Sequence, residues 1–85
     1  MRDEVVETVR QYIIDTYLPG EDPRALGPST ELISSGILDS LATLDLVSYL
    51  EGRFNIELDA HEVDTASLGT LDRIAQLVET KLGAG

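Results

Sequence analysis

The chain has 85 residues, enough for one small domain spanning residues 1–85 and too few for a second core. Six basic against sixteen acidic residues give a net charge of −10, which argues against binding to nucleic acid or anionic membranes, since such binding needs clustered lysine and arginine. There is no cysteine, so the chain supplies no disulfide, thiolate nucleophile or cysteine metal site. The charge favours basic protein partners instead, or serves simply to keep the protein soluble.

The amino-terminal residues lack the apolar core of a secretory signal, and no apolar run approaches the length of a membrane span. We therefore expect a cytoplasmic monomer with no membrane insertion. The hydrophobic fraction of 42% is typical of folded chains and argues against disorder. At the usual value per residue, the free energy of unfolding would be about 4–13 kcal/mol.

The first expected element is a helix over residues 3–18, which ends at Leu18-Pro19-Gly20. A long connection over residues 19–38 follows, and its Pro23–Leu26 segment allows one turn of helix. Connections this long are unusual in a small domain and are often functional. The apolar residues at helical spacing in the first helix are Val5, Val6, Val9, Tyr12, Ile13 and Tyr17. Those expected to fill the core from the connection are Leu26, Leu32, Ile33 and Ile37.

The second helix is expected from Ser40 to about Phe54. Asp39 is a suitable N-cap because its side chain can accept hydrogen bonds from first-turn amides, and Asn55 can adopt the left-handed conformation that ends helices. Helical spacing predicts a buried face made of Thr43, Leu46, Val47, Leu50 and Phe54. The opposite face holds Leu41, Asp45, Ser48 and Gly52, with Leu44 at the border.

A short third helix over residues 59–64 and a last helix over residues 71–82 complete the pattern, and Thr70 caps the last one. Residues 83–85 are expected to form a flexible tail, which leaves about residues 3–82 structured. The sequence thus predicts an all-α fold, a small bundle of three main helices plus one short helix. The predicted buried stripe of the last helix is Leu71, Ile74, Ala75, Val78 and Leu82.

Ser40 is the most distinctive candidate for a functional residue. Unpaired amides and partial positive charge at a helix start would favour a phosphate ester on this serine. An isolated Asp-Ser pair would indicate only a helix cap, because such pairs cap helices widely. Leu41 is an apolar residue that points away from the predicted core. A lone exposed leucine is common, but this one lies directly beside Ser40 and suits contact with a partner.

The sequence around Ser40 resembles the acyl carrier and peptidyl carrier protein family. The resemblance rests on Leu-Ile-Ser-Ser-Gly-Ile-Leu-Asp-Ser-Leu at 32–41 and on the runs at 44–51 and 53–58, and the helix order extends it over nearly the whole chain. It implies an acyl-carrier-protein-like fold and a non-catalytic protein with 4'-phosphopantetheine, taken from coenzyme A, on Ser40. Asp39 would help to hold a divalent cation during the transfer, and the resemblance implies no resident metal.

The resemblance also implies partners. The attached arm would carry an acyl or aminoacyl group as a thioester between enzymes. These would be a phosphopantetheinyl transferase, an adenylating or acyl-loading enzyme, and a downstream synthase, tailoring enzyme or thioesterase. The residues expected to contact them are Leu41, Leu44, Asp45, Ser48, Glu51 and Glu62.

The second helix departs from the pattern of fatty-acid carriers. Those proteins usually have an acidic residue where Ala42 stands, a methionine at the position of Ser48 and an acid at that of Gly52. These departures, together with the Gly-Ile-Leu-Asp-Ser-Leu and Leu-Glu-x-Arg-Phe pieces, favour a discrete carrier in polyketide or nonribosomal-peptide biosynthesis. A D-alanyl or fatty-acid carrier protein is the alternative.

Two other classes of function stay open. An acidic helical interaction module would explain the charge, but it would never acquire phosphopantetheine. A serine hydrolase is disfavoured, because His61 is the only histidine and no Gly-x-Ser-x-Gly turn is present.

The acidic residues within the segment 57–64 lack the order of a calcium-binding EF-hand loop. The scattered tyrosines Tyr12, Tyr17 and Tyr49 are assigned to the core edge or the surface.

Overall fold

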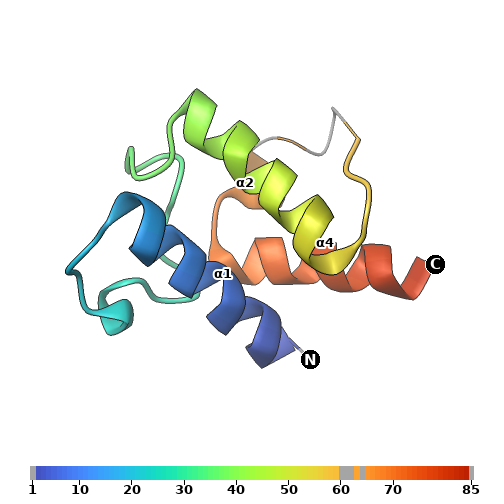
Figure 1. The fold of residues 1–85 in the computed structure, drawn as a ribbon, viewed down its shortest axis with the longest axis horizontal. Coiled ribbons are helices and arrows are strands. Elements are labelled where there is room, and N and C mark those ends of the chain that lie inside the picture. Colours follow the sequence, from blue (N-terminus) through green and yellow to red (C-terminus); the bar gives the residue numbers. More distant parts are fainter. Residues whose placement is uncertain (1, 60–62, 64, 85) are drawn as a thin grey trace.

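The computed structural model describes residues 2–59, 63 and 65–84. In chain order they form α1 (Arg2–Tyr17), the 3-10 turn η1 (Pro23–Ala25), α2 (Ser40–Phe54), α3 (Thr65–Leu68) and α4 (Leu71–Ala84) (Figure 1). The predicted all-α bundle of three main helices plus a short one is confirmed. None of the helices in this described part of the chain is both long and apolar enough to cross a membrane.

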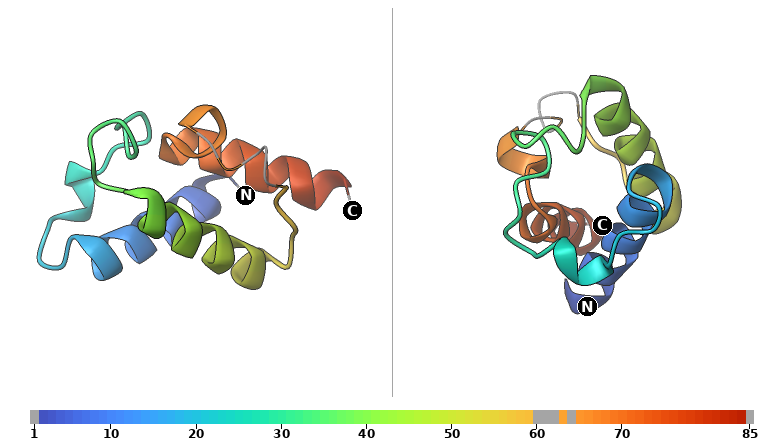
Figure 2. Two further views of the ribbon diagram at one scale, coloured as in Figure 1. Left: turned by 90° about the horizontal axis from the view of Figure 1, so that it is seen from above. Right: turned by 90° about the vertical axis from the view of Figure 1, so that its left-hand side faces the viewer.

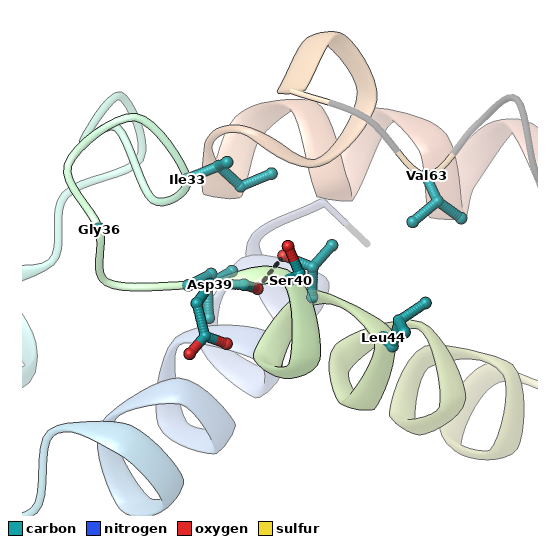
Figure 3. A pocket seen from close by; sticks show the side chains of 8 residues that line it. Ile33, Gly36, Asp39, Ser40, Leu44 and Val63 are labelled. Atoms are coloured by element: carbon teal, nitrogen blue, oxygen red, sulfur yellow. Dashed lines mark hydrogen bonds between the residues drawn. The ribbon is translucent and has the colours of Figure 1, made fainter.

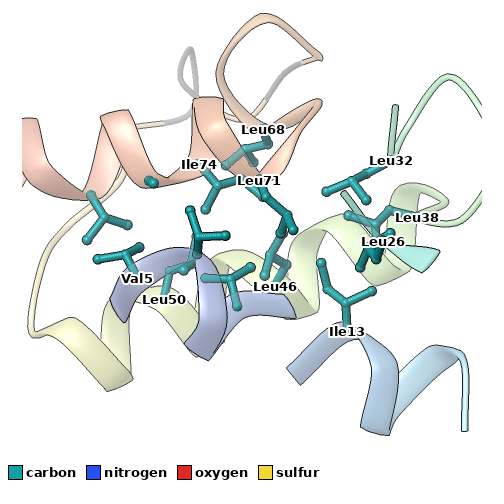
Figure 4. Close-up of a cluster of buried hydrophobic side chains, with 14 of the residues drawn as sticks. Val5, Ile13, Leu26, Leu32, Leu38, Leu46, Leu50, Leu68, Leu71 and Ile74 are labelled. Carbon is teal, nitrogen blue, oxygen red and sulfur yellow. The ribbon is translucent and has the colours of Figure 1, made fainter. Parts of the chain in front are cut away.

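The three long helices enclose a single apolar interior. α1 packs along α4, and α2 closes the interior from another side, as the two further views show (Figure 2). Side chains from all three helices and from the long connection converge there (Figure 4). The largest fully buried ones are Val9, Ile13, Leu26, Leu32, Leu38, Leu46, Leu50, Leu68, Leu71, Ile74 and Val78.

The connection between α1 and α2 is anchored to the helices around it. The amide of Leu32 donates to the carbonyl of Gly69 at 2.7 Å, and the amide of Asp72 donates to Pro28 at 3.1 Å. Arg10 Nε of α1 donates to the carbonyl of Leu26 at 2.8 Å. Leu26 and Leu32 are fully buried, and Ile33 and Ile37 pack against the core, as predicted. The connection therefore holds the start of α2 in a defined place.

The observed helix ends lie within one residue of the predicted ends, except at the short helix and at the end of α4. Asp59 and Val63 are not helical, and the short helix begins at Thr65, so the prediction of a helix over 59–64 is wrong for these two residues. A physical reason is that the amide of Leu58 donates to Glu51 Oε2 at 3.0 Å, which ties the chain to α2 as it leaves that helix. Residues 60–62 and 64 lie outside the described residues. α4 continues through Ala84, two residues into the expected tail.

Two predictions about side chains are also wrong. Leu82 is 38% exposed and does not join the buried stripe of α4, because it lies near the end of α4, where little packs over the helix. The three tyrosines are not scattered. The rings of Tyr12 and Tyr49 stack with centroids 4.0 Å apart, and Tyr17 meets Tyr12 edge-on at 6.1 Å. They lie at the core edge, as expected, and join α1 to α2.

Candidate functional site

Asp39 fixes where α2 begins. Its backbone is extended (φ −85, ψ −173), and its carboxylate accepts a hydrogen bond from the amide of Ala42 at 2.8 Å. The carbonyl of Asp39 accepts from both the amide and the hydroxyl of Thr43, at 2.9 and 2.8 Å. At the other end of α2, Asn55 adopts φ 56 and closes the helix. Both predicted caps are confirmed, so Ser40 is the first residue of α2.

Ser40 is exposed at this helix start and borders a hollow (Figure 3). The hollow measures about 550 Å³, and Ile33 and Val63 lie across it from Ser40 and Leu44. Its lining consists of Ile33, Gly36, Leu38, Asp39, Ser40, Thr43, Leu44 and Val63. A slender chain attached to the Ser40 hydroxyl would have both an open path to solvent and an apolar surface beside it.

The electrostatics at Ser40 suit a phosphate ester. The Asp39 carboxylate accepts the hydrogen bond of the Ala42 amide. The amides of Ser40 and Leu41 have no acceptor within the helix because they belong to its first turn. These amides and the partial positive charge of the helix start favour a bound anion. The residues present therefore fit a phosphodiester on Ser40, with the Asp39 carboxylate satisfied as a cap.

Tyr17 is a contact of this site that sequence reasoning did not identify. Its hydroxyl donates to the carbonyl of Ala42 at 3.4 Å, so the end of α1 touches the first turn of α2. Burial raises the pKa of Tyr17, and hydrogen bonding with Tyr12 and the negative charges of Asp45 and Asp39 raise it further. The hydroxyl thus stays protonated at neutral pH and cannot act as a base. No spacing in the sequence signals this contact between helices.

The expected partner-contact residues of α2 mostly share one exposed side. Leu41 is 73% exposed and Leu44 is 56% exposed, with Asp45 and Ser48 also exposed. We call Leu41, Leu44, Asp45 and Ser48 the α2 stripe. Glu51 is partly buried, and its carboxylate accepts the bond from the amide of Leu58 described above, so it holds the exit of α2. Glu62 and His61 lie outside the described residues.

Ala42 extends the buried face of α2 beyond the prediction. Its side chain is buried, whereas the predicted core members Val47 and Phe54 are only partly buried. The reason is that α1 covers this side of α2 through Tyr17. An acidic side chain at this position, as fatty-acid carriers usually have, would be placed against the end of α1.

Replacing Asp39 separates its capping role from its charge. Asp39→Ala should lower the free energy of unfolding by about 1 kcal/mol, because the amide of Ala42 loses its acceptor. Asp39→Asn should lower the free energy of unfolding much less, since asparagine caps helices about as well as aspartate. Urea denaturation of the parent and both variants measures the difference. Equal stability of Asp39→Ala and the parent would contradict the capping role.

Comparisons with known proteins agree with this geometry. A family model described as a phosphopantetheine attachment site matches residues 7–83. The D-alanyl carrier protein of Enterococcus faecalis is 33% identical over 75 residues, which cover 88% of this chain and 94% of that protein. The D-alanyl carrier protein of Lactococcus lactis subsp. cremoris is 36% identical over 69 residues, 81% of this chain and 86% of that protein.

A third relative extends over almost the full length of both chains. The D-alanyl carrier protein of Leuconostoc citreum is 31% identical over 83 residues, 98% of this chain and 97% of that protein. The family match covers the Ser40 site, the whole of α2 and most of α1 and α4. The chain therefore belongs to the phosphopantetheine-binding carrier proteins, a family that holds a covalent cofactor and is not itself catalytic.

Proposed function

We propose that Ser40 is the attachment point of 4'-phosphopantetheine and that residues 1–85 form one carrier domain for an amino acid, with D-alanine as the first candidate. The observation that carries the proposal is the position of Ser40, exposed as the first residue of α2 beside an apolar hollow. This position lies within the region that the phosphopantetheine attachment model matches.

The residues of the chain would present Ser40 and stabilise the attached phosphate. The amides of the first turn and the helix dipole act on the phosphate, while Asp39 keeps the helix start in place. Because the chain contains no cysteine, the cofactor would supply the thiol that holds the cargo as a thioester. We expect the transferase to remove the Ser40 proton, since the Tyr17 hydroxyl, which contacts the first turn of α2, stays protonated.

The relatives support one cargo over another. The sequence alone favoured polyketide or nonribosomal-peptide biosynthesis, with a D-alanyl carrier as the alternative. The relatives just described are D-alanyl carrier proteins, which supports the alternative. An aminoacyl cargo also agrees with the absence of an acid at Ala42 and Gly52, where fatty-acid carriers usually have one.

The family implies a phosphopantetheinyl transferase and a loading enzyme as partners. We propose that both contact the α2 stripe, in which two exposed leucines lie beside Asp45, and that the chain works as a cytoplasmic monomer. A downstream acceptor enzyme would use the same exposed side of α2, since Ser40 lies at its end. The net charge of −10 would steer basic enzymes toward the protein.

Association with the transferase should slow as salt rises. Long-range attraction is screened over about 8 Å at physiological ionic strength, so steering by the net charge weakens. Stopped-flow association rates between 0.02 and 0.5 M sodium chloride measure this dependence. A rate that does not change with salt would contradict electrostatic steering.

Loading of the modified protein tests the cargo. The phosphopantetheinylated protein would be incubated with ATP and a ligase that activates D-alanine. Either D-alanine or L-alanine would be added, and the intact mass of the protein would be measured. We expect a gain of one alanyl group with D-alanine, and no gain in the Ser40→Ala variant. Acceptance of malonyl or another acyl group from a matched synthase, without D-alanine loading, would favour the biosynthetic role instead.

A further inference from the structure

A second hollow lies between α1 and α2, on the flank of α2 away from Ser40. It measures about 560 Å³, and we call it the α1–α2 groove. At 100° per residue, Tyr49 in this groove and Ser40 in the other hollow point to opposite sides of α2, with the α2 stripe between them. The groove is lined by Glu7, Thr8, Gln11, Tyr12, Asp15, Thr16 and Tyr49.

An aromatic pair forms one part of the groove. Tyr12 and Tyr49 are partly buried and stack nearly in parallel, 13° apart, and Tyr17 supports Tyr12 edge-on. Two rings held in this way lose little freedom when a ligand packs on them. Aromatic faces attract cations, and a planar guanidinium can also stack on them.

A row of side chains that can accept hydrogen bonds forms another part of the groove. Glu7, Gln11 and Asp15 are spaced four residues apart and therefore follow one side of α1 over about two turns. Glu7 is 68% exposed and pairs with Arg10, and the Gln11 amide donates to Asp15 Oδ1 at 2.8 Å. A carboxylate can accept several hydrogen bonds at once, so both acids can still receive donors from a partner.

Arg10 offsets part of this negative rim through its pair with Glu7, whereas the Asp15 carboxylate accepts from the neutral amide of Gln11. The Arg10 side chain is only 15% exposed, and its Nε is committed to the carbonyl of Leu26. The groove thus combines stacked rings with two carboxylates, on a protein that carries a net charge of −10. The complementary group is a planar cation that both stacks and donates several hydrogen bonds.

We propose that the α1–α2 groove is a docking surface for an arginine-bearing segment of a partner protein. A guanidinium would lie against the Tyr12–Tyr49 pair and donate to Glu7 or Asp15. Arginine fits better than lysine, because a guanidinium can stack and form forked hydrogen bonds. A partner seated here borders the α2 stripe and leaves Ser40, on the other flank, open. The inference does not depend on modification of Ser40.

Titration with defined peptides tests the groove. The probe is a short blocked peptide of arginines spaced by glycines, compared with its lysine and citrulline counterparts, in two-dimensional ¹H–¹⁵N spectra of the unmodified protein. We expect shifts concentrated in residues 7–16 and at Tyr49, about threefold weaker binding of the lysine peptide, and no binding of the citrulline peptide. Equal binding of the arginine and lysine peptides would overturn the proposal.

Two matched pairs of substitutions distinguish binding in the groove from general attraction to an acidic protein. Glu7→Gln with Asp15→Asn should weaken binding of the arginine peptide about fivefold. Glu31→Gln with Glu57→Gln removes the same charge from exposed positions that do not line the groove, and should weaken binding less than twofold. All four residues are exposed, so both variants should fold. Equal losses in the two pairs, or shifts spread over the whole acidic surface, would refute the groove.

Discussion

The Ser40→Ala variant is expected to accept no phosphopantetheine while its free energy of unfolding stays within about 0.5 kcal/mol of the parent. The modification is lost because the hydroxyl that would form the phosphodiester is gone. Stability is kept because Ser40 is exposed and the capping bond to Ala42 comes from Asp39. Alanine is also the best helix former.

Circular dichroism melting and intact mass, measured on the same samples, check both halves of this prediction. The matched control is Ser48→Ala, which removes an exposed serine two turns further along α2. It should be modified as the parent is. If Ser40→Ala unfolded, Ser40 would be a structural residue, and if it were still modified, the attachment point would lie elsewhere.

Truncating Leu46 should have the largest effect on stability. Leu46 is fully buried in the centre of the core, so Leu46→Ala should lower the free energy of unfolding by about 2–5 kcal/mol through lost burial and a cavity. For a chain whose total stability is about 4–13 kcal/mol, this would remove a large share. Urea denaturation followed by circular dichroism gives the difference.

Leu44→Ala is the control for this change, since it removes the same atoms one half-turn away. Leu44 is 56% exposed at the edge of the hollow beside Ser40, so the loss should stay below about 1 kcal/mol. It should instead slow docking, because Leu44 belongs to the α2 stripe. Similar losses of stability in both variants would contradict the orientation of α2 in this fold.

Features set by neighbouring residues were predictable from the sequence. Asp39 and Asn55 cap α2 through contacts within a few residues, so their roles follow from residue type and position. The buried faces of α1 and α4 largely follow from helical periodicity, but Ile14 is buried although it was not predicted to be, and Leu82 is exposed. The exposure of Leu41 followed from the same periodicity.

Features set by packing between helices were not predictable. The buried position of Ala42 and the stacking of Tyr12 on Tyr49 depend on how α1 lies against α2, which no local pattern encodes. The hollow beside Ser40 likewise needs Val63, a residue far along the chain, to face α2. The non-helical path at Asp59, just after α2, follows a bond from the Leu58 amide to the Glu51 carboxylate that sequence periodicity does not predict.

Mapping the site of modification tests the central claim most directly. The parent protein would be incubated with coenzyme A, magnesium and a promiscuous phosphopantetheinyl transferase, digested, and sequenced by tandem mass spectrometry. The account predicts one phosphopantetheine per chain, located on Ser40. Modification of Ser34 or Ser35 instead, or no modification of a folded sample, would contradict it.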